Sequence, residues 1–67
     1  MTTGEKLRKY RGKKSIEQVA SDLGVSVSAY TKYERNERTP RPRVMEKIAD
    51  YYNKSVQTIF FSTSGDR

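Results

Sequence analysis

The sequence contains no cysteine, no histidine and no long apolar run. Without cysteine no disulfide can form, and without cysteine and histidine the usual ligand sets of zinc and haem are missing. The longest apolar stretch, around residues 59–61, is far shorter than the roughly 20 residues that span a bilayer. The start shows no signal-peptide pattern. We therefore expect a cytoplasmic protein with no metal, no cofactor and no membrane contact.

The missing residue types also argue against catalysis. The eight acidic residues are scattered over expected helix surfaces, where they form no plausible catalytic pair or cavity. A chain of 67 residues suffices for one domain with one small core, because domains near this size bury only about 60% of the surface of the unfolded chain. Stability must then come from helix packing or from oligomerisation. We expect a non-enzyme without a second, ligand-sensing domain and without a small-molecule ligand.

Positive charge is the main bias of the composition. Fourteen Lys and Arg stand against eight Asp and Glu, which gives a formal net charge of +6. The basic residues gather in two clusters, at positions 6–14 and 32–43. Solvated helix faces would explain such clusters, and so would a surface that binds a polyanion.

Capping residues and apolar periodicity predict five short helices. Thr2 and Glu5 fit a capping box, and Leu7 and Tyr10 provide the buried stripe of a first helix that ends near residues 11–12. Fourth and fifth helices are expected after Pro42 and Ser55, with Asn53 between them. Their apolar residues are Val44, Ile48, Ala49 and Tyr52 in the fourth helix and Val56, Ile59 and Phe60 in the fifth.

Residues 15–34 form the most informative stretch. Ser15 and Gln18 predict a capping box that opens the second helix, and Gly24 ends that helix in a left-handed conformation. Ser26 caps the third helix, which is expected to run to Glu34 with Tyr30 and Tyr33 on its inner side. The short connection 24–26 forces a tight turn between steeply crossed helices, so the outer face of the third helix projects from the core. Such a helix can enter a DNA major groove.

The segments that carry a family resemblance are 15–20, 23–26 and 30–34, followed by 35–41, 47–52 and 55–61. In this order and spacing they resemble the Cro/C1-type (XRE) helix-turn-helix family, which includes the lambdoid phage repressors and Cro. The resemblance implies an all-α, five-helix, lambda-repressor-like domain over residues 1–61, with a disordered tail at 62–67. It also implies a sequence-specific regulator that binds a palindromic operator in double-stranded DNA as a homodimer, most often as a repressor of a phage, prophage or mobile element.

The family positions that face the groove correspond here to four residues, which are the expected base contacts: Val27, Ser28, Thr31 and Lys32. Residues expected to contact the DNA backbone flank that helix: Lys14, Ser15, Ser26, Arg35, Asn36, Arg38, Arg41 and Arg43. The resemblance further implies an ion pair between Arg11 and Glu34. A dimer interface that includes Ile59 and Phe61 is expected because Phe61 must point away from the core side of its helix; the alternative is that Phe61 folds back on its own domain, against Tyr51. Ile16 occupies a position where many members have Gln, and it either completes the apolar stripe or leaves the phosphate contact to backbone N–H groups.

Other functions stay open at this point. Related small domains serve as antitoxins or as adaptors that bind a protein, and controller proteins of restriction systems activate transcription. A polar outer face flanked by arginines favours DNA over an apolar partner surface. We therefore expect a nucleoid-associated protein in the cytoplasm of a bacterial or phage-infected cell.

Overall fold

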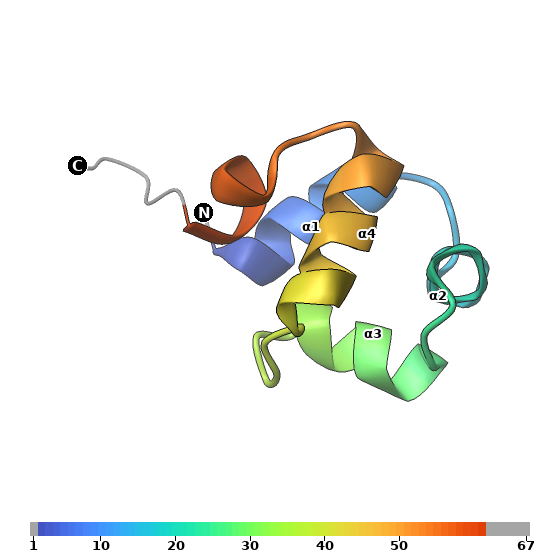
Figure 1. Ribbon diagram of the computed structural model, residues 1–67. Coiled ribbons are helices and arrows are strands. Elements are labelled where there is room, and N and C mark those ends of the chain that lie inside the picture. Colours follow the sequence, from blue (N-terminus) through green and yellow to red (C-terminus); the bar gives the residue numbers. More distant parts are fainter. Residues whose placement is uncertain (1, 62–67) are drawn as a thin grey trace.

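The computed structural model describes residues 2–61, in which helices are joined by short turns and loops (Figure 1). The elements are α1 (Thr3–Arg11), α2 (Ile16–Leu23), α3 (Val27–Glu34), α4 (Pro42–Tyr52) and η1 (Gln57–Phe61). No strand occurs among these residues, so the predicted all-α class with five helices is confirmed. The tail predicted at 62–67 lies outside the described residues.

The predicted N-caps begin the first three helices. The Thr2 side chain accepts the backbone N–H of Glu5, and the Glu5 carboxylate accepts the N–H of Thr2 at 2.8 Å, which completes a capping box. Ser15 accepts the N–H of Gln18, whose side-chain amide donates to Asp22 at 2.9 Å instead of completing a second box. Each cap satisfies an N–H group that the helix itself leaves without a partner.

The helix ends also follow the sequence. Gly24 ends α2 at φ 74° and ψ 28°, and Asn53 ends α4 at φ 59° and ψ 44°, both left-handed conformations that these residue types tolerate. Asn36, after α3, has φ 60°. Pro42 occupies the first turn of α4, where its missing N–H costs nothing.

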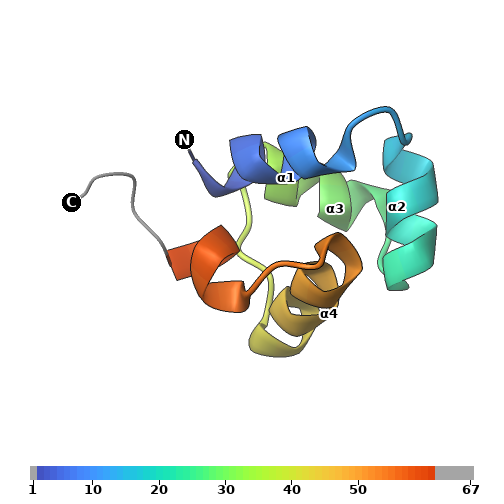
Figure 2. The same ribbon diagram turned by 90° about the horizontal axis from the view of Figure 1, so that it is seen from above.

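The core lies between α1, α3 and α4, and α2 and η1 lie at opposite ends of the molecule in both views (Figures 1 and 2). Its largest fully buried side chains are Tyr30, Leu7, Ile48, Ile59 and Val19. Met45 and Pro40 are also buried, although no apolar periodicity singled them out. Ile16 packs against the core as a half-buried residue, which agrees with its place in the apolar stripe of α2.

The last element differs from the expected α-helix. Residues 57–61 form a π-helical turn, and Ser55 accepts the N–H of Thr58 at its entrance. In this wider turn Ile59 enters the core and Phe60 packs against it. Apolar spacing in so short a segment does not distinguish an α-helix from a π-helix, because one turn of either helix brings residues four apart close together.

Figure 1 shows α2 along its axis while α3 crosses the view, so the two helices of the predicted motif are steeply crossed. Val25 and Ala20 close the turn between them through a 3.0 Å backbone hydrogen bond. The described helices are all too short and too polar to cross a membrane. Residues 2–61 also hold no group of three or more acidic side chains placed to bind a metal ion.

Candidate nucleic-acid interface

The outer face of α3 is open to solvent along one edge of the molecule (Figure 1). Val27, Ser28 and Lys32 are exposed there, and Thr31 is half-buried. These positions share one side of the helix because residues three to five apart in an α-helix are neighbours. The structure therefore brings together the four residues predicted to contact bases, and none of them belongs to the core.

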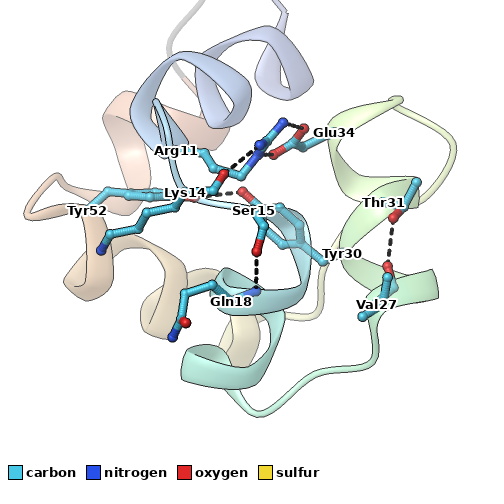
Figure 3. A network of polar contacts seen from close by, with 9 residues as sticks. All are labelled: Arg11, Lys14, Ser15, Gln18, Val27, Tyr30, Thr31, Glu34 and Tyr52. Carbon is cyan, nitrogen blue, oxygen red and sulfur yellow. Dashed lines mark hydrogen bonds and ion pairs between the residues drawn. The ribbon is translucent and has the colours of Figure 1, made fainter.

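The hydroxyl groups at this face differ in whether the proton is still available for a hydrogen bond. Ser26 accepts the N–H of Ala29 at 3.0 Å, so its own O–H remains available as a donor. Thr31 Oγ1 donates to the carbonyl oxygen of Val27 at 2.7 Å, one turn earlier in the same helix (Figure 3). The proton of Thr31 is therefore already in use.

An ion pair anchors the end of α3 to α1, as the sequence predicted. Arg11 donates from Nε to Glu34 Oε2 at 2.6 Å and from Nη2 to Oε1 at 3.0 Å (Figure 3). The third branch, Nη1, donates to the carbonyl of Lys14 at 2.8 Å. The hydrogen bond to Glu34 raises the pKa of Arg11 above its ordinary value. Only 5% of the Glu34 side chain is exposed, so its carboxylate depends on this partner.

A second contact anchors the middle of α3 to α4. The hydroxyl groups of Tyr30 and Tyr52 lie 2.7 Å apart. Desolvation by burial raises the pKa of both tyrosines. Tyr52 also stacks against Tyr10 and Tyr51, with ring centroids 5.7 and 5.1 Å apart. Polar contacts to α1 and α4, on the side opposite its outer face, thus fix the position of α3.

Asn36, predicted to contact the DNA backbone, is exposed, and its side chain bonds to the start of α1. Oδ1 accepts the N–H of Gly4 at 2.9 Å, and Nδ2 donates to Thr2 Oγ1 at 3.1 Å. Gly4 is buried against the end of α3, where a Cβ atom would overlap the carbonyl group of Glu34. The side chain of Asn36 therefore links the end of α3 to the start of α1. No signal in the sequence indicated this partner.

The arginines that follow α3 remain candidates for phosphate contacts. Arg38, Arg41 and Arg43 are exposed, and within residues 2–61 no carboxylate pairs with them. Arg35 lies 3.1 Å from Glu37, with both side chains largely in water. Such a surface pair is weak, since exposed pairs contribute about 0–1 kcal/mol. The loop after α3 and the start of α4 therefore present three uncompensated guanidinium groups.

Lys14 and Ser15 lie before α2. The ammonium group of Lys14 is 3.0 Å from the Tyr51 hydroxyl, which in turn donates to Asp22 at 2.6 Å. The bond to Tyr51 raises the pKa of Lys14, and the bond from Tyr51 lowers the pKa of Asp22. Because an ammonium group has three N–H donors, this exposed side chain keeps donors available for a phosphate contact. Sequence reasoning missed the network because Tyr51 is 29 positions from Asp22 and 37 from Lys14.

The two residues predicted at the dimer interface differ in burial. Ile59 has no exposed surface and belongs to the core of its own chain, so its assignment to the dimer interface was wrong. Its neighbour Phe61 is 58% exposed. Phe61 lines a cavity of about 160 Å³ together with residues of α1, α4 and the loop after α3, including Thr3, Met45 and Pro40. Phe61 therefore remains the candidate for contact with a second copy.

Comparison with known proteins agrees with this geometry. The helix-turn-helix family profile matches residues 5–59, which covers most of the chain and all of the exposed α3 face. No curated protein sequence gives a significant match.

Proposed function

Because this chain belongs to the Cro/C1-type helix-turn-helix family and is therefore a DNA-binding transcriptional regulator, we propose that it represses a promoter as a homodimer on a palindromic site. The regulated promoter belongs to a phage, a prophage or another mobile element, and the protein acts in the cytoplasm. Repression, that genetic context and the dimer are all parts of the proposal.

The observation that carries the proposal is the pairing of an uncovered α3 face with unpaired arginines beside it. Major-groove readers place a short helix against base edges while neighbouring cations hold the phosphates on either side. Val27, Ser28, Thr31 and Lys32 would meet the bases. Arg38, Arg41 and Arg43 would hold phosphates, with Arg35 contributing after it exchanges Glu37 for DNA.

The N-terminal ends of α2 and α3 supply further backbone contacts. Ser15 and Ser26 keep hydroxyl protons that can be donated to phosphate oxygens, and the free N–H groups of the first helical turns favour anions. One subunit reads only a few base pairs. A two-fold dimer spaces its recognition helices by about 34–36 Å, one turn of DNA, which doubles the site.

A gel-shift titration against random duplex at several salt concentrations tests the DNA part of the proposal. The logarithm of affinity should fall against the logarithm of salt with a slope near −0.9 per phosphate contact. Arg38→Ala should reduce that slope by about one contact per subunit, whereas Arg8→Ala, which removes an exposed arginine from α1, should leave it unchanged. A flat salt response would favour a protein-binding module of the antitoxin or adaptor kind.

The sign of regulation needs a separate measurement. A reporter promoter that overlaps the duplex selected from a random pool should lose transcription when the protein is expressed. A gain in transcription would instead identify an activator of the controller type.

A further inference from the structure

Thr31 cannot offer a hydroxyl proton to a base while it keeps its observed bond. Oγ1 donates to the Val27 carbonyl at 2.7 Å, a bond that threonine often makes to the preceding turn of a helix (Figure 3). The Cβ atom of threonine carries one oxygen and one methyl group as its two heavy branches. With the proton bonded to the helix backbone, the oxygen can act only as an acceptor, and the methyl group is the branch that offers an apolar contact.

Val27 stands one turn before Thr31 on the same face. Its side chain is 44% exposed, and within residues 2–61 only Val27 and Phe61 are large apolar side chains with such exposure. Val27 therefore contributes little to the core. Together the two residues place methyl groups next to one another, in a row that lies beside the row formed by Ser28 and Lys32.

Only thymine among the four DNA bases presents a methyl group in the major groove, and small apolar side chains recognise it by contact. We infer that Val27 and Thr31 form a methyl-reading pair that selects thymine at one or two positions of each half-site. Ser28 and Lys32 carry the hydrogen-bond readout beside it. This assignment rests on the proposed function, and it gives Thr31, expected from the sequence as a base contact, an apolar role in that contact.

The test begins with a duplex selected by the wild-type protein from a random pool. This duplex is then remade with deoxyuridine in place of thymidine at one position at a time, which removes a single methyl group and keeps the base pair. At one or two positions of each half-site, affinity should fall about fourfold, the factor that corresponds to about 0.8 kcal/mol for one buried methyl group. Uracil at the remaining positions should have no effect.

Two substitutions at the same residue separate the methyl group from the hydroxyl. Thr31→Val keeps a methyl branch and loses the oxygen, so it should bind within about twofold of the wild type and stay sensitive to uracil. Thr31→Ser keeps the oxygen and loses the methyl group, so it should lose about fourfold in affinity and become insensitive to uracil at one position. Ser28→Ala serves as the matched control, since it should weaken binding without changing the ratio between thymine and uracil duplexes.

The outcomes distinguish this inference from the proposed function. Failure of the wild-type protein to select any duplex overturns both. Selection of a duplex that tolerates uracil everywhere overturns only the methyl-reading pair. The methyl-reading pair is also overturned if Thr31→Ser binds as well as the wild type and Thr31→Val binds less well. This comparison requires that Thr31→Val has an unchanged helical spectrum.

Discussion

The hydroxyl of Tyr30 in α3 lies 2.7 Å from the hydroxyl of Tyr52 at the end of α4, although the two residues are 22 positions apart in the sequence. This contact removes both phenol groups from water, and burial raises the pKa of each. Both tyrosines are neutral at physiological pH, so the hydrogen bond between them buries no charged group.

High pH should therefore unfold the domain. A pKa raised in the folded state means that the folded protein holds the proton more tightly, so stability is complete below the unfolded-state pKa of about 10 and falls as the pH rises above it. Helical circular dichroism and phenolate absorbance, followed together, should show part of the phenolate signal appearing only as helix is lost. A double variant, Tyr30→Phe with Tyr52→Phe, should have a weaker pH dependence. Complete ionisation of the tyrosines within an intact fold would contradict this expectation.

Removal of the Arg11 side chain should be far more costly than the loss of a surface ion pair. Arg11→Met leaves the nearly buried Glu34 carboxylate without its partner, which costs about 3–5 kcal/mol in comparable buried pairs. A core of this size supplies a similar amount, so the variant should be largely unfolded at room temperature. Adding Glu34→Gln to Arg11→Met should recover part of the loss in urea unfolding. A cost below about 1 kcal/mol for Arg11→Met would show that the pair acts like an exposed one.

Asn36 and Asn53 form a matched pair for separating backbone conformation from side-chain bonding. Both have left-handed backbones, at φ 60° and φ 59°. Asn36→Gly removes the acceptor of the buried Gly4 N–H and should cost about 1–3 kcal/mol, whereas Asn53→Gly should change stability by only a few tenths. The affinity of the folded protein for DNA should be the same in both variants. A lower affinity for Asn36→Gly alone would indicate that the Asn36 side chain contacts the DNA backbone.

Ile59→Asp and Phe61→Asp should have opposite effects on folding. Ile59→Asp places a charge in the core and should abolish the helical spectrum. Phe61→Asp changes an exposed residue, so the spectrum should persist while sedimentation equilibrium at micromolar concentration shows monomers and operator binding falls. A Phe61→Asp protein that still dimerises would move the interface to another surface.

Local chemistry in the sequence was enough to predict the order of the elements and the type of the first four. Thr2, Ser15 and Ser26 cap the helices they were expected to cap, and Gly24 and Asn53 end the helices that precede them. These signals are readable because a cap or a left-handed turn involves residues only a few positions apart. The outer positions of α3, of which Val27, Ser28 and Lys32 are exposed and Thr31 is half-buried, followed from the same short-range periodicity.

Tertiary structure decided which side chains remain free to act. Asn36 reaches Gly4 across 32 positions, and Tyr51 reaches Asp22 across 29, so no local pattern contains either contact. Apolar spacing placed Ile59 and Phe61 in one short helix, but only the packing of η1 against α1 buries the first and exposes the second. Periodicity identifies the faces of a helix, while the neighbours that cover a face are set by long-range packing.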